Sequence, residues 1–199
     1  MQIDRKLSTI IRVIERIYLP TAQGIGTSLF LKNQIDKEIH FPPGFFINLI
    51  QITGNLVANA FKFTPSNGSV EVVFTLDTDE GQNILNMAIT YFGRSIPHDL
   101  VSALSQGKIT PKPTVAEEQP CFAARLHHVM QIVSKEKGRI FMENENGSET
   151  TFLLTFPIPD KYLNQKNGFH PIVKKDAVLQ NGSKSSSSRA FSKPSFHRS

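Results

Sequence analysis

The chain has 199 residues, 39% of them hydrophobic, which suits one domain with a buried core and excludes a fibrous or wholly disordered protein. Its single cysteine, Cys121, excludes an internal disulfide, and no uninterrupted apolar run approaches the ~18 residues that span a bilayer. Both observations predict a cytoplasmic protein without membrane insertion. The net charge of +5 is uneven: residues 161–199 hold eight Lys or Arg and one acid, a balance of +7, which leaves −2 for residues 1–160.

The first third of the chain predicts a helix, a strand and a second, longer helix. Apolar residues recur at helical spacing from residue 7 to 18, and Pro20 with the glycines after it predicts that this helix loosens or ends there. Residues 27–35 have β-compatible side chains in partial alternation, which predicts a strand. The turn at 41–44 then leads into the central helix.

The rest of the globular part predicts a hairpin, a helix and a second hairpin. The first hairpin is expected at residues 69–77 and 83–90, and the amphipathic helix at 122–137. The last hairpin, 139–144 with 150–156, surrounds Asn146-Gly147, a strong turn dipeptide. Between the first hairpin and the helix, 97–107 predicts a short helix and the proline-rich stretch 109–120 a loop.

This order of elements predicts an α+β fold, a two-layer α/β sandwich with a mixed sheet and helices on one face. Residues 1–160 are expected to form the domain. Residues 161–199, rich in serine, lysine and arginine, are expected to form a disordered tail. No alternation of aromatic and basic residues continues from the tail into the domain, which argues against a nucleic-acid partner.

The central helix has a polar stripe and an apolar face. Gln51, Asn55, Asn59 and Lys62 fall within an arc of roughly 80° on a helical wheel. The apolar side chains fill an arc of roughly 140° on the other side: Phe46, Leu49, Ile50, Thr53, Leu56, Val57, Ala60 and Phe61. A carboxamide oxygen can bind Mg²⁺ and a lysine can neutralise phosphate, so the stripe suits a phosphate chain and its metal. The alternative is a solvated face of a core helix.

The segment Asn55-Leu-x-x-Asn59-Ala-x-Lys62-Phe63-Thr64-Pro65 resembles the asparagine-rich box of the histidine-kinase ATPase domain, a member of the Bergerat-fold superfamily. The hairpin from 138 to 157 is similar to the last hairpin of that domain, so the resemblance covers about residues 5–158. It implies the Bergerat ATPase fold. It also implies that Asn59 binds Mg²⁺, that Lys62 binds the phosphates and that Phe63 lies near the base, with Asn55 in the same site.

Two further boxes of the family are altered. The family turn Asp-x-Gly-x-Gly-Ile-Pro, whose aspartate accepts a hydrogen bond from the adenine amino group, corresponds here to Tyr91-Phe-Gly93-Arg-Ser-Ile96-Pro. Gly93 and Ile96 match it, but Tyr91 replaces the carboxylate. The glycine box Gly-x-Gly-Leu-Gly-Leu corresponds to Cys-Phe-Ala-Ala-Arg125-Leu, which has no glycine. Arg125 could instead hold a phosphate through its guanidinium.

These departures predict a degenerate, pseudokinase-like ATPase domain in two-component signal transduction. It is expected to act by contact with a signalling protein, namely a kinase, a response regulator or a transcription regulator, with weak or no ATP binding. No residue is assigned a catalytic role and no cofactor is expected. The alternative is the ATP-binding domain of a divergent sensor histidine kinase, which would use Mg·ATP to phosphorylate a histidine on a separate domain or chain.

Overall fold

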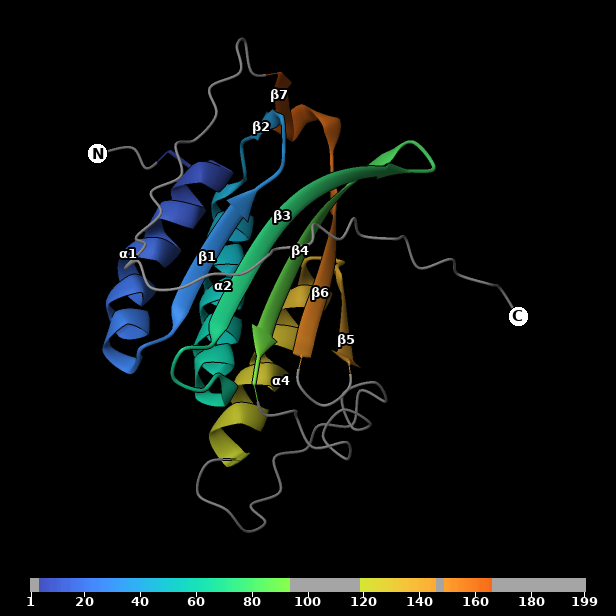
Figure 1. The fold of residues 1–199 in the computed structure, drawn as a ribbon. Helices are drawn as coiled ribbons and strands as arrows, with labels where there is room; N and C mark the ends of the chain where they lie inside the picture. Colours follow the sequence, from blue (N-terminus) through green and yellow to red (C-terminus); the bar gives the residue numbers. More distant parts are fainter. Residues whose placement is uncertain (1–3, 94–118, 146–148, 166–199) are drawn as a thin grey trace. The chain divides into compact units, whose positions relative to one another are not determined.

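The computed structural model describes residues 4–93, 119–145 and 149–165, and all structural statements concern these ranges. Helices and strands alternate irregularly along them (Figure 1). The elements in chain order are α1 (Leu7–Ile25), β1 (Ser28–Asn33), β2 (Lys37–Ile39), α2 (Pro43–Phe63), β3 (Ser69–Asp79), β4 (Gln82–Phe92), α4 (Gln119–Lys135), β5 (Arg139–Glu145), β6 (Glu149–Ile158), the 3₁₀ turn η1 (Asp160–Tyr162) and β7 (Leu163–Gln165).

Five strands form a mixed sheet in the order β1-β3-β4-β6-β5. β1 runs parallel to β3, and the other neighbours are antiparallel. Buried and half-buried residues alternate along β6, as expected for a strand with one face against a core. The helices lie behind the sheet in Figure 1, so its other face carries no helix among the described residues. The predicted two-layer α/β sandwich with a mixed sheet is therefore confirmed.

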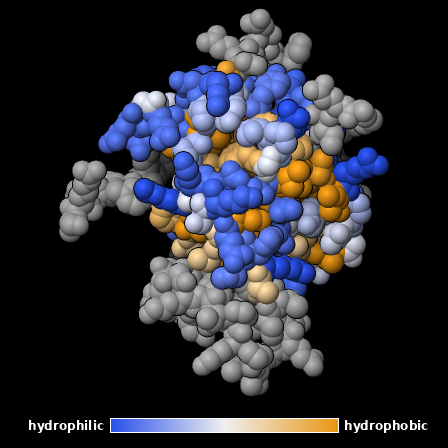
Figure 2. Space-filling view, turned by 180° about the vertical axis from the view of Figure 1, so that it is seen from behind, coloured by the Kyte–Doolittle hydropathy of each residue, from blue (hydrophilic) through white to orange (hydrophobic). Residues whose placement is uncertain are grey.

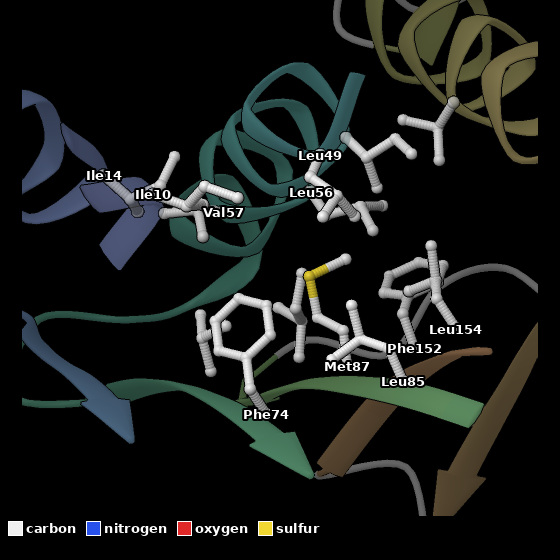
Figure 3. Close-up of a cluster of buried hydrophobic side chains, with 14 of the residues drawn as sticks. Ile10, Ile14, Leu49, Leu56, Val57, Phe74, Leu85, Met87, Phe152 and Leu154 are labelled. Carbon is white, nitrogen blue, oxygen red and sulfur yellow. The ribbon is translucent and has the colours of Figure 1, made fainter. Parts of the chain in front are cut away.

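The core lies between the helices and one face of this sheet (Figure 3). Ile10 and Ile14 of α1 and Leu49 and Leu56 of α2 point toward the sheet, and each is at most 1% exposed. The strands present a matching set of buried side chains: Phe74, Leu85, Met87, Phe152 and Leu154. Burial of such apolar surface is the main contribution to the stability of this layer pair.

Helix α1 is longer than its sequence suggested. It continues through Pro20 and ends at Gly26, whose φ of 70° is the left-handed C-cap conformation that glycine favours. The helix therefore ends at the glycines, as predicted, whereas Pro20 does not end it. Pro20 lacks the N–H that would bond to the carbonyl of Arg16, but both residues are exposed, so water can satisfy that carbonyl.

Helix α2 is the central element of the helical layer. Pro43 occupies its first turn, where a missing N–H does no harm, and Thr64 follows its last residue as the cap. By length and composition alone α2 could cross a membrane, but 61% of the apolar window is buried inside the fold. A core helix packed against α1, α4 and the sheet has this composition.

The remaining expectations have mixed outcomes. Both hairpins and the second amphipathic helix are present, and Glu80 and Gly81 form the β3–β4 turn with positive φ angles. The short helix at 97–107 and most of the loop at 109–120 lie outside the described residues, as do the turn at 146–148 and residues 166–199.

The pairing of β2 with β7 was not foreseen. It brings residues 163–165, beyond the boundary expected at 160, into a two-stranded sheet.

Candidate functional site

The C-terminal turn of α2 and the end of β4 meet at the residues that the sequence singled out. Phe63 is the last residue of α2, and its ring stacks on that of Tyr91 with centroids 6.0 Å apart and planes 24° apart. Asn59 lies one helical turn before Phe63, on the same side of the helix. Three of the sequence-derived positions are therefore neighbours in the fold.

Asn59 is buried rather than presented on a polar face. Its exposed fraction is 1%, whereas Gln51 and Lys62 of the same predicted stripe are exposed and Asn55 is intermediate. Within the described part of the chain, neither Oδ1 nor Nδ2 of Asn59 has a hydrogen-bond partner. The continuous polar face drawn from the helical wheel is thus wrong at Asn59, which is buried in the fold. A buried amide without partners costs about 1–3 kcal/mol, so this group can gain from a ligand or water.

Helix α4 contacts α2. The Asn48 amide near the start of α2 donates to the carboxylate of Glu136, which directly follows α4. The two helices run antiparallel from that contact, which places the α2 end with Asn59 beside the N-terminal half of α4. Helix α4 therefore packs along α2 in the helical layer.

Tyr91 points to the core side of β4 and is 1% exposed. Its hydroxyl makes no hydrogen bond of standard geometry with the described residues. Burial raises the pKa of Tyr91 to about 12, against a smaller lowering effect of Thr150, its partner across the β4–β6 pair. At neutral pH this position therefore holds a neutral phenol, where the resemblance places a carboxylate.

Gly93 packs against protein backbone. A Cβ at this position would clash with the carbonyl group of Phe63 and lie 3.0 Å from the Cα of Thr64. Close approach of β4 to the end of α2 therefore explains this glycine without any ligand. Ile96, the other matched residue of the same turn, lies outside the described residues.

The charge of Arg125 acts on Tyr18 of α1. Burial raises the pKa of the half-buried Tyr18, and the positive charge of Arg125 lowers it in part. The Tyr18 hydroxyl reaches Gly54 of α2, where an added Cβ would lie 2.9 Å from Oη. The sequence reading missed this contact, although a glycine in the middle of a helix is a signal of close packing.

The predicted site residues thus divide into groups. Asn59, Phe63, Tyr91 and Gly93 converge at one end of the helix–sheet interface, whereas Asn55 and Lys62 lie toward the surface of α2. Among the described residues, no group of three His, Cys, Asp or Glu side chains could hold a metal ion. A metal ion at this site would be held by the Asn59 carboxamide and by ligands that bind together with the metal.

The sequence model of the histidine kinase-, DNA gyrase B- and HSP90-like ATPases matches residues 46–160. The chain belongs to this ATPase family. The autoinducer 2 sensor kinase/phosphatase LuxQ of Vibrio parahaemolyticus is 30% identical over 152 residues, which are 75% of this chain and 18% of LuxQ. The adaptive-response sensory kinase SasA of Synechococcus elongatus is 28% identical over 110 residues, 55% of this chain and 27% of SasA. The chain spans less than a third of each relative's length.

Solved histidine-kinase structures share the fold. The nucleotide-free catalytic domain of histidine kinase ThkA matches with a TM-score of 0.57 and 16% identity, over 76% of this chain and 93% of that one. Full-length ShkA in complex with AMPPNP matches with a TM-score of 0.58 and 20% identity, over 75% of this chain and 29% of ShkA. The chain therefore has the fold of histidine-kinase ATPase domains.

Mg·ATP is the group that this family implies, and the residues fit it at one end only. The unsatisfied carboxamide of Asn59 suits Mg²⁺, which takes oxygen ligands. The base end does not fit, because Tyr91 is neutral, bulkier than a carboxylate and stacked on Phe63.

Proposed function

We propose that this ATPase-family domain works in a sensor-kinase pathway by contact with another signalling protein, with ATP binding weak or lost. The stack of Tyr91 on Phe63 is the observation that carries this proposal. An adenine amino group needs an acceptor, and a carboxylate is a stronger acceptor than a phenol whose pKa is about 12. The tyrosine ring also takes space that a smaller aspartate would leave open. A cytoplasmic location remains part of the proposal.

The relatives support the choice of partner class. The curated relatives are sensor kinases, in which this domain is a minor part of a longer chain. We therefore expect the partner to be a kinase, a response regulator or a transcription regulator of the same pathway. In this function the domain contributes a recognition surface, and the affinity for its partner is independent of Mg·ATP.

One observation favours the alternative function, an ATP-binding kinase domain that acts on a histidine of another domain or chain. Asn59 keeps a buried carboxamide that no described residue satisfies. A buried polar group without a partner is unusual in a protein core and is often explained by a ligand or a water. Mg²⁺ bound with a nucleotide would satisfy its oxygen.

Thermal unfolding with and without millimolar Mg·ATP separates the two functions. A ligand at a hundredfold its dissociation constant stabilises the folded state by about 2.7 kcal/mol. The contact function predicts no shift in the midpoint for wild type or for Asn59→Ala. A shift in wild type that disappears in Asn59→Ala would overturn it in favour of the kinase function. Asn86→Ala, on the helix-free face of β4, is the control for loss of an asparagine.

A further inference from the structure

A short strand at one end of the domain contacts two segments that are far apart in the sequence. Residues 37–41, which we call the strap, lie between the N-terminal segment 4–6 and the C-terminal segment 160–165. The strap includes β2, which pairs with β7 at the top of Figure 1 and, among the described strands, belongs to no larger sheet. A two-stranded pair is marginally stable on its own, so the order of the strap depends on its neighbours.

Adjacent amides of the strap bond to opposite neighbours. The Phe41 amide donates to the carbonyl of Arg5 in the N-terminal segment, over 2.8 Å. The His40 amide donates to the carbonyl of Tyr162 in the C-terminal segment, also over 2.8 Å. Successive backbone groups of a strand point to alternate sides, so the two segments flank the strap. A movement of the strap therefore weakens both bonds at once.

The two faces of the strap have different surroundings. Ile39 and Phe41 are 1% and 2% exposed and belong to the core. Glu38 and His40 alternate with them and lie on the outer face. Figure 2 shows mainly hydrophilic side chains at the upper end of the domain, where β2 and β7 lie in Figure 1. The strap is therefore fixed by apolar side chains on one face and carries ionisable groups on the other.

A small ion network joins the outer face of the strap to the N-terminal segment. Nζ of Lys6 lies 3.1 Å from Oε1 of Glu38 and 3.3 Å from Oδ2 of Asp4. The second oxygen of Glu38, Oε2, lies 3.1 Å from Nε2 of His40. Burial raises the pKa of Glu38, but hydrogen bonds from His40 and Lys6 outweigh it and hold the pKa below its ordinary value. One carboxylate thus contacts both the N-terminal segment and the residue whose amide binds the C-terminal segment.

The C-terminal segment has contacts of its own with the domain. Leu163 lies opposite Ile39 of the strap and packs against the core. Asp160 accepts a hydrogen bond from the amide of Asn83, at the start of β4. The pairing with the strap therefore adds to an apolar contact and a polar contact that place this segment beside it.

We propose that the strap couples the two segments, so that release of the N-terminal segment loosens the C-terminal segment and the reverse. Each neighbour that is paired reduces the conformational entropy that the strap loses when it binds the other. A coupling of this kind is reciprocal, because it is a free energy shared by the two contacts. In LuxQ and SasA, of which this chain spans 18% and 27%, a domain of this kind adjoins other parts of a longer protein. The inference is independent of nucleotide binding and of the function proposed above.

Amide hydrogen exchange of the full chain, followed residue by residue with NMR, tests the coupling in both directions. The strand register and the bond from His40 to Tyr162 place the Asn164 amide against the strap, so it reports on the C-terminal side. Lys6→Gln removes the charge of the N-terminal segment and should speed exchange at Asn164 by roughly two- to fivefold.

The reverse experiment perturbs the C-terminal segment. Leu163→Ala weakens its contact with the core and should speed exchange of the Phe41 amide, which bonds to Arg5, by at least roughly twofold. Lys32→Gln is the matched control, since it breaks an ion pair with Glu71 on the main sheet. It should leave the exchange of both reporter amides unchanged.

The proposal requires that each variant changes the exchange on the side that it does not touch. If Lys6→Gln leaves Asn164 at the wild-type rate and Leu163→Ala leaves Phe41 unchanged, the two segments are independent and the proposal is overturned. The amides of β4 serve as the reference for the stability of the whole domain. Acceleration of these amides by the same factor would mean global destabilisation and would equally reject coupling through the strap.

Discussion

The ring of Tyr91 lies 6.0 Å from that of Phe63, with an angle of 24° between the two planes. This stack joins the end of β4 to the end of α2 without any bound ligand. Gly93, two residues after Tyr91, packs against the carbonyl group of the same Phe63. The two contacts together close the helix–sheet interface where the family resemblance places a nucleotide base.

Replacement of Tyr91 by phenylalanine should leave the free energy of unfolding within about 1 kcal/mol of wild type. The stack on Phe63 survives, and the lost hydroxyl makes no hydrogen bond of standard geometry with the described residues. Tyr91→Ala should instead lower the free energy of unfolding by about 3–5 kcal/mol through the cavity it leaves. Urea denaturation measures both. A loss above about 2 kcal/mol in Tyr91→Phe would mean that the hydroxyl is satisfied.

Alkaline pH should destabilise the wild type through the same phenol. The pKa of Tyr91 is raised from its ordinary value of 10.0 to about 12 in the folded state, so the unfolded chain loses this proton first. The stabilising effect is complete below about pH 10 and is lost as pH rises to about 12, a change of about 2–3 kcal/mol. Tyr91→Phe should show a correspondingly smaller fall over this range. If the free energy of unfolding fell equally in the two proteins, the loss could not come from Tyr91. The remaining titrating groups, Tyr18 included, are common to both.

Asn59→Leu should raise the free energy of unfolding of the nucleotide-free protein by about 1 kcal/mol. An apolar side chain of similar size removes a buried amide that no described residue satisfies. Asn83 is the matched control, because it is also buried but donates to the Asp160 carboxylate. Asn83→Leu should therefore lower the free energy of unfolding by about 1–3 kcal/mol. Loss of stability in both variants would show that Asn59 has a partner in the free protein.

The fold was largely predictable because each main element has a clear local signal. The 3.6-residue periodicity of α2 and the turn residues of both hairpins give the element order. Pro20 misled because a proline on the exposed side of a helix removes one hydrogen bond that water can replace. The short strands β2 and β7 could not be read from their three residues each, since their pairing joins distant segments, with Ile39 opposite Leu163, 163 − 39 = 124 residues later.

The site was predictable in composition but not in exposure. The asparagine-rich box identified Asn59 and Phe63, and the altered turn identified Tyr91. A helical wheel treats a polar arc as one surface, whereas the fold buries Asn59 and leaves Lys62 of the same arc exposed. Gly93 was assigned to a ligand by resemblance, and only the packing shows that the Phe63 carbonyl already requires it.

Gly93→Ala should lower the free energy of unfolding by about 1–3 kcal/mol even without nucleotide. The added methyl group would meet the Phe63 carbonyl, and backbone cannot move aside as a flexible side chain can. Gly24→Ala is the control, because nothing lies within 4 Å of its added Cβ and it sits in the last turn of α1. That change should be neutral or stabilise by up to about 1 kcal/mol. Denaturant midpoints compare the two, and equal effects would contradict the close approach.

Gly54 and Tyr18 should show energetic coupling in a double-mutant cycle. With tyrosine at position 18, a Cβ added at Gly54 would lie 2.9 Å from the hydroxyl oxygen of Tyr18 but 3.5 Å from its nearest ring carbon. Gly54→Ala should therefore gain little or lose stability with tyrosine at position 18. In a Tyr18→Phe background the clash is absent, and the same change should stabilise by about 0.5–1 kcal/mol through helix propensity. A coupling energy of at least about 0.5 kcal/mol is expected from urea denaturation of the four proteins. If the free-energy changes of the two single variants simply add up in the double variant, Tyr18 rotates away freely. Packing against Tyr18 would then not explain the glycine at position 54.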